Sequence, residues 1–191
     1  MKTLYVLAAA FGCLLTVNTA SAQMDSVAAH KAWMAYMTPG PEHQQLAKTE
    51  GDWTTDMTFW KGPGAKPEKA TGSCSNKMIL GGRYQESRFT SDMMGMPFEG
   101  LGTTAYDNAR KMYLNTWIDN MGTGMMMMEG KWEPAVNGIV YRGKSYDPAM
   151  QKTMDLRQVI KFQDANNYTL EMYRMANGKE FKEMEIAFKR K

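Results

Sequence analysis

The sequence predicts an all-β protein, an antiparallel up-and-down β-barrel of about ten strands with short N-terminal helices at one end. From Gly51 onward, strand-like segments follow one another with turns roughly every 8–12 residues, and no clear helix interrupts them. This rhythm is typical of a meander and not of a parallel α/β fold. Closing the meander into a barrel removes the exposed strand edges that an open sheet would leave.

The first predicted strand begins at Gly51. Trp53, Thr55, Met57 and Phe59 alternate with mostly polar neighbours, so they share one face of the strand. We expect this face to line the barrel and Trp53 to fill its closed end.

The later strands are predicted from the same alternation and from the turn residues between them. They cover 70–80, 83–91, 98–106, 111–119, 125–133, 139–146, 153–162, a segment from 168, and a last strand in which Met184, Ile186 and Phe188 face inward. Residues 51–191 therefore form one predicted barrel domain.

Two short helices are predicted in the N-terminal segment 23–50, at 26–37 and 41–48. Ser26 is a suitable N-cap for the first, and Pro41 suits the first turn of the second. Both are too short for a helix bundle, so we expect them to lie across one mouth of the barrel.

Residues 1–22 have the features of a secretory signal peptide. Lys2 is followed by an apolar run over 4–17 and by the small residues of Ala20-Ser21-Ala22, which predicts cleavage between Ala22 and Gln23. An uncleaved anchor would need about 20 apolar residues, more than this run supplies. A lipoprotein site at Cys13 is disfavoured because the apolar run continues past it. We therefore expect a periplasmic or secreted protein without a transmembrane segment in the mature chain.

Composition limits the function classes. A chain of 191 residues with 43% hydrophobic residues suits one domain with a sizeable core. The net charge of +3 is spread without a basic stripe, which argues against nucleic-acid binding. Once Cys13 leaves with the signal peptide, Cys74 is the remaining cysteine, so no internal disulfide can form and a buried, inert thiol is the simplest interpretation.

The triplet Gly51-Asp52-Trp53 resembles the Gly-x-Trp signature of the lipocalin and calycin barrels. The resemblance implies that a basic residue near the last strand packs over Trp53, and Lys189 or Arg190 could do so. More of the chain, from Pro41 onward, is similar to a bacterial lipocalin-like family known only as a domain of unknown function. The matching pieces are Pro41-Glu42-His43, Leu80-Gly81-Gly82-Arg83-Tyr84, Gly100-Leu101-Gly102, Tyr106-Asp107-Asn108 and the stretch 117–124. The resemblance implies a fold and supplies no catalytic residues.

Methionine is unusually frequent, with 20 in the chain and clusters at 93–96 and at 121–128. Thioethers are soft ligands that suit Cu(I), so a periplasmic copper-handling protein is one alternative. Flexible methionines also fill irregular cavities, and consecutive residues of a strand point to opposite faces, so Met125 to Met128 cannot all reach one ion. We favour a role in lining the interior and predict no metal site.

Histidine is scarce, and His30 and His43 both precede the barrel. A haem-binding barrel of the nitrobindin type would be expected to offer an axial histidine from a late strand, and a zinc site needs more ligands than these two. We therefore expect no cofactor, and we expect His43 to pack where its helix meets the barrel.

An enzyme on a calycin barrel is the second alternative. Asp119 follows Trp117 at a strand end and could act as a general base, but fixing the turn over 120–124 is the simpler role for this carboxylate. No nucleophile–base or metalloprotease motif is present. We predict no catalytic residues.

The leading interpretation is a protein that binds a small hydrophobic or amphipathic molecule in the barrel interior. Polar groups on otherwise apolar inward faces are the candidate ligand-binding residues. They are Tyr84, Arg88, Tyr106, Trp117, Tyr141 and Gln158. If Arg88 points inward it could bind a carboxylate, but it could equally pair with Glu86 in solvent.

Overall fold

A computed structural model describes residues 26–93, 95–176 and 178–191. Two helices, α1 (Ser26–Met37) and α2 (Pro41–Ala47), precede ten strands. The strands are β1 (Gly51–Phe59), β2 (Glu68–Ile79), β3 (Tyr84–Met93), β4 (Met96–Asp107), β5 (Met112–Asp119), β6 (Met126–Glu133), β7 (Gly138–Asp147), β8 (Lys152–Phe162), β9 (Asn167–Ala176) and β10 (Lys179–Arg190). A 3₁₀ turn at Pro134–Val136 joins β6 to β7.

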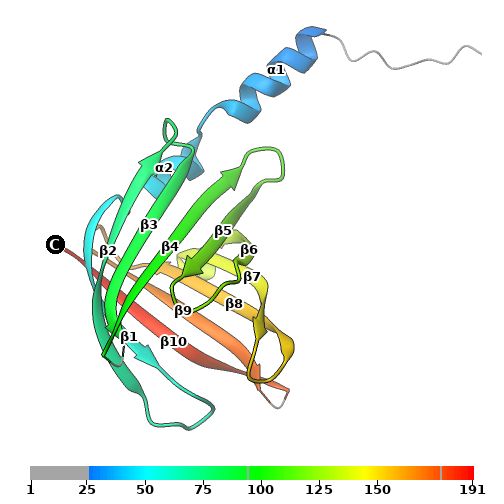
Figure 1. Ribbon diagram of the computed structural model, residues 1–191. Helices are drawn as coiled ribbons and strands as arrows, with labels where there is room; N and C mark the ends of the chain where they lie inside the picture. Colours follow the sequence, from blue (N-terminus) through cyan, green and yellow to red (C-terminus); the bar gives the residue numbers. More distant parts are fainter. Residues whose placement is uncertain (1–25, 94, 177) are drawn as a thin grey trace, which may run out of the picture.

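The ten strands form a closed antiparallel barrel in which each pairs with its neighbours in sequence and β1 pairs with β10 (Figure 1). Trp53 stands opposite Arg190 in the closing pair. This closed pairing of strands that follow one another in sequence confirms the predicted fold class. We call the end that carries α2 the closed end, and the end that carries the β1–β2, β3–β4, β5–β6, β7–β8 and β9–β10 loops the open end.

The barrel has two groups of buried side chains. One surrounds Trp53 and includes Tyr168 and Phe188, whose rings stack with centroids 4.1 Å apart. The other includes Tyr113 and Tyr141 and reaches Leu46 of α2. Both groups lie on the inner faces of the strands, as the period-two alternation predicts.

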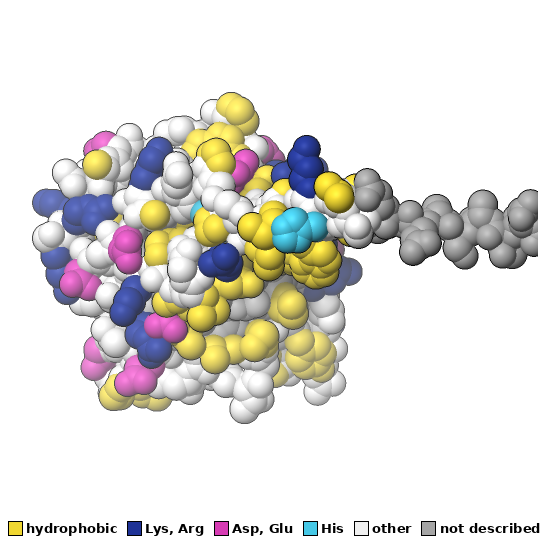
Figure 2. Space-filling model, turned by 90° about the horizontal axis from the view of Figure 1, so that it is seen from above, with side chains coloured by type: hydrophobic (Ala, Val, Ile, Leu, Met, Phe, Trp, Pro, Cys, Tyr) yellow, Lys and Arg dark blue, Asp and Glu magenta, His cyan; other side chains and the backbone are white. Residues whose placement is uncertain are grey.

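Both predicted helices are present, but only α2 covers the barrel end. α1 projects away from it (Figure 1). None of its residues is buried, and hydrophobic side chains lie exposed along it (Figure 2). Asn108 holds its C-terminal end by donating from Nδ2 to the carbonyl oxygens of Tyr36 and Thr38 at 3.1 and 2.8 Å. This differs from the expectation that both helices cross the mouth.

The predicted signal peptide over 1–22 lies outside the described residues, as does Met94 of the first methionine cluster. Within the described part of the chain, neither helix has the length and apolar character needed to cross a membrane.

Candidate ligand-binding cavity

Trp53 fills the closed end. It is 1% exposed, its Nε1 donates to the carbonyl oxygen of Thr49 at 2.9 Å, and its ring meets Tyr168 edge-on at 4.7 Å. The Arg190 guanidinium lies 4.2 Å from the ring centroid and donates to the carbonyl oxygens of Lys48 and Glu50 at 2.8 and 2.7 Å. Arg190 therefore connects the end of β10 to the segment between α2 and β1, and its guanidinium covers the Trp53 indole.

Polar side chains complete this closure beneath α2. Gln85 donates to the carbonyl oxygen of Leu46 and to the Thr49 hydroxyl at 2.7 and 2.9 Å. Asn76 donates to the Thr49 carbonyl at 3.0 Å and to the Tyr168 hydroxyl at 3.1 Å. These buried amides add hydrogen bonds to the Leu46 carbonyl, in the last turn of α2, and to the Thr49 carbonyl, two residues beyond the helix.

His43 and Cys74 are structural parts of the closed end. The Gly40 amide donates to Nδ1 of His43 at 3.0 Å, the imidazole lies edge-on to Tyr106 at 5.9 Å, and burial lowers the His43 pKa. Cys74 is buried, and burial raises the pKa of its thiol to about 12, so a thiolate is not available at neutral pH. Both observations agree with the predicted packing roles.

Beyond these groups the barrel is not filled by its own side chains. A cavity of about 790 Å³ runs from Leu46 and Gln85 to the loops of the open end. Its volume lies in the range of sites that hold small organic molecules. The apolar part of the wall includes Met57, Phe59, Phe89, Trp117, Ile139, Leu156, Ile160, Leu170, Met172, Met184, Ile186 and Phe188.

The methionines of the second cluster do not all point to one face, although Met93, Met121, Met125 and Met126 border the same cavity. In Met126 to Met128 the side chains alternate, with Met128 buried and Met127 exposed, and Met125 is exposed as well. No group of three or more His, Cys, Asp and Glu side chains that could hold a metal occurs among residues 26–93, 95–176 and 178–191. The inward methionines give the wall a flexible, polarizable surface.

Gln158 is the buried polar group of the wall that faces the cavity without a partner. Its side chain is 3% exposed and makes no hydrogen bond to any described residue. Its register partner on β7 is Tyr141, whose buried hydroxyl also lacks a partner among the described residues, and burial raises the Tyr141 pKa well above its ordinary value. A buried hydroxyl without a partner is rare in folded proteins. The Tyr141 hydroxyl and the unpartnered Gln158 amide opposite it therefore mark the part of the wall where a bound molecule or water would be stabilised.

Charged groups line the cavity at its rim. Arg174 contacts Asp147 at 2.7 Å and Glu183 at 2.6 Å, so one cation lies between two carboxylates. Burial raises the pKa of Glu183 even though Arg174 acts to lower it. Asp119 accepts hydrogen bonds from Trp117 Nε1 at 2.7 Å and from the Met121 amide at 2.9 Å. The Asp119 carboxylate thus fixes the turn and the indole, which is the simpler of its two predicted roles.

Residues 38–190 match the sequence profile of a family described as "Protein of unknown function (DUF1579)". The chain belongs to this family. Among solved structures, the crystal structure of Rv2717c from M. tuberculosis is similar, with a TM-score of 0.57 and 14% identity over 81% of this chain and 99% of that chain. A redesigned β-barrel shows a weaker likeness, with a TM-score of 0.39 and 12% identity over 76% of this chain and 94% of that chain. No match is found among curated proteins.

In this DUF1579 barrel, three of the predicted ligand-binding residues, Trp117, Tyr141 and Gln158, line the cavity. Tyr106 faces inward at the closed end, where its ring packs against His43 and Tyr113, with centroids 5.9 and 4.9 Å away. It belongs to the closure beneath α2 and not to the cavity wall.

Tyr84 and Arg88 lie on the outer surface. The Arg88 side chain is 66% exposed and its Nε contacts Glu86 at 2.7 Å, so the alternative of a solvent-exposed pair is the one that the structure contains. The inward members of β3 are Gln85, Ser87 and Phe89. The sequence of β3 alternates between two faces, but each face carries both polar and aromatic residues. The sequence alone therefore does not identify which face points into the barrel.

Proposed function

We propose that this protein binds a small hydrophobic or amphipathic molecule inside the barrel. The supporting observation is the apolar cavity of about 790 Å³, which opens toward one end and is closed at the other by Trp53 and α2. A flexible methionine and aromatic wall suits several apolar ligands of similar size better than one polar metabolite.

Diphenylhexatriene, an uncharged hydrocarbon dye that fluoresces in apolar surroundings, should bind the folded protein. Because Trp117 lines the cavity, bound dye should quench its emission, and Trp117→Phe should lower the fraction of tryptophan emission lost at saturation. Trp33→Phe, on the projecting α1, is the matched control and should not lower that fraction. If dye fluorescence rises only under conditions that partly unfold the chain, ligand binding in the barrel must be abandoned.

We also propose that the protein acts in the periplasm or outside the cell after cleavage of residues 1–22. The intact mass of the exported protein should correspond to a chain that starts at Gln23, with or without cyclisation of that residue to pyroglutamate. A lipid-modified chain starting at Cys13 would overturn this proposal, and mass spectrometry of the purified protein distinguishes the two.

A further inference from the structure

The polar side chains around the cavity are charged near the open end and uncharged farther in. This arrangement determines which class of ligand the cavity can hold. The charged residues that border the cavity are Asp119, Lys144, Arg174 and Glu183, which all lie in the open-end halves of their strands. Farther in, the polar side chains of the wall are amides and hydroxyls, which carry no charge.

The cations at the rim are already paired. Arg174 contacts both Asp147 and Glu183, and the side chains of all three are less than one-third exposed. Lys144 points outward, with its side chain 71% exposed and its Nζ 3.6 Å from Asp155. A ligand carboxylate inside the cavity would therefore meet no unpaired cation, and at the rim it would approach Asp119 and Glu183. Burying a carboxylate without an opposite charge is strongly unfavourable.

The amide side chains deep in the cavity differ in how many of their hydrogen-bonding groups are without a partner. The side-chain nitrogens of Gln85 and Asn76 are engaged with the segment after α2 and with Tyr168. Gln158 has neither its oxygen nor its nitrogen engaged with a described residue. It lies near the middle of β8, about 20 Å along the strand from the open end, which leaves room for an alkyl chain between this amide and the rim.

We infer that the ligand is an uncharged amphipathic molecule, whose hydroxyl, carbonyl or amide group is received by the side-chain amide of Gln158 and whose apolar part lies against the methionine and aromatic wall. A primary amide offers one acceptor and two donors, which complements such neutral groups without requiring a counter-charge. The inference rests on the proposed function and specifies the ligand class of the same cavity. Gln158 acts in it as a residue that determines specificity.

Displacement of diphenylhexatriene by three ligands of equal chain length tests the inference. At mildly alkaline pH, decanamide and 1-decanol should displace the dye at concentrations about tenfold lower than decanoate, which is ionised there. Gln158→Leu should raise the decanamide concentration needed by about tenfold and leave the affinity for the hydrocarbon dye unchanged, because the dye has no hydrogen-bonding group. Unchanged dye binding also reports that the variant has folded with its cavity intact.

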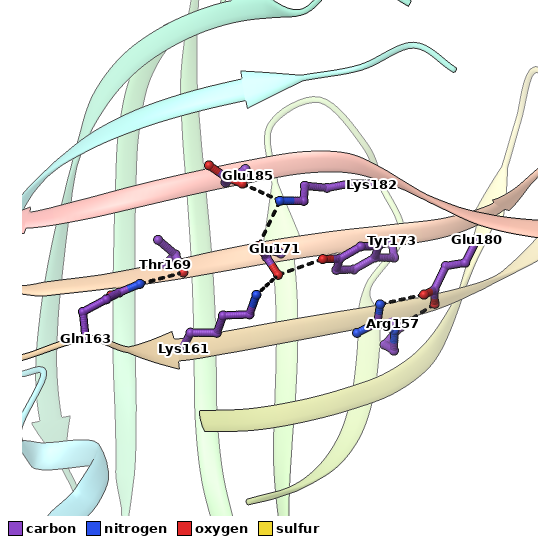
Figure 3. A network of polar contacts seen from close by, with 9 residues as sticks. All are labelled: Arg157, Lys161, Gln163, Thr169, Glu171, Tyr173, Glu180, Lys182 and Glu185. Atoms are coloured by element: carbon purple, nitrogen blue, oxygen red, sulfur yellow. Dashed lines mark hydrogen bonds and ion pairs between the residues drawn. The ribbon is translucent and has the colours of Figure 1, made fainter. Parts of the chain in front are cut away.

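Gln163→Leu is the matched control, since this glutamine is exposed outside the cavity and its Nε2 donates to the Thr169 hydroxyl (Figure 3). It should behave like the unmodified protein with all three ligands. Decanoate binding as tightly as decanamide, or a Gln158→Leu variant that binds decanamide normally, would overturn the inference while the proposed function stands. Absence of binding by the dye and by every ligand would overturn the proposed function itself.

Discussion

Replacing Trp53 by alanine should lower the free energy of unfolding by about 3–5 kcal/mol, the range for large aromatic truncations in well-packed interiors. The indole is almost fully buried, and the substitution removes its contacts with Tyr168 and with the Arg190 guanidinium. It also leaves the Thr49 carbonyl without the indole donor. Because Trp53 contacts β9, β10 and the segment after α2 together, the surrounding side chains cannot collapse into the space.

Chemical denaturation followed by circular dichroism measures this loss. Trp33→Ala on α1 is the control, since that side chain is 61% exposed, and it should change the stability by less than about 0.5 kcal/mol. A loss below about 1 kcal/mol for Trp53→Ala would mean that the indole does not hold the closed end together.

The fold could be predicted because its signals are local. The inward alternation that starts at Trp53 and the turns between strands are readable from short windows, and most strand ends fall within two residues of the predicted ones. The sequence leaves both Lys189 and Arg190 as candidates to pack over Trp53. Only the register of β1 against β10, in which Arg190 stands opposite Trp53, shows that Arg190 does so.

The site was less predictable because it depends on contacts between segments far apart in the chain. Gln85 faces inward and donates to the carbonyl of Leu46 and to the hydroxyl of Thr49 beneath α2, and no pattern within β3 reveals these partners. Gln158 could be selected because it interrupts an otherwise apolar inward face. Its lack of a partner is visible only in the assembled barrel.

The second large effect concerns Glu171, on the outer face of β9 (Figure 3). Its carboxylate contacts Lys161 at 2.6 Å and Lys182 at 2.9 Å, and the Tyr173 hydroxyl donates to it at 2.8 Å. Only 9% of the side chain is exposed. Burial by itself would raise the pKa of Glu171, but the hydrogen bonds from Lys161, Lys182 and Tyr173 outweigh burial and lower the pKa to about 2.

A carboxyl group whose pKa is lower in the folded than in the unfolded chain stabilises the fold above its unfolded pKa. Its ordinary pKa is 4.5, so this stabilisation is complete above about pH 5 and is lost as the pH falls toward 2. The size of the shift corresponds to about 3 kcal/mol at neutral pH. Breaking a buried ion pair by removing one partner has a cost of similar size.

We therefore expect Glu171→Gln to lower the free energy of unfolding by about 3 kcal/mol at neutral pH, because Lys161 then loses the carboxylate that it contacts and Lys182 keeps only its ion pair with Glu185. The difference from the unmodified protein should shrink steadily as the pH is lowered from 5 toward 2, because the unmodified carboxylate also becomes protonated. Urea denaturation at a series of pH values measures both quantities. Glu129→Gln is the control, since its pair with Arg110 is about half exposed and the substitution should change the stability little at any pH. A difference for Glu171→Gln that stays constant across the acidic range would show that the carboxylate charge is not what stabilises this face of the barrel.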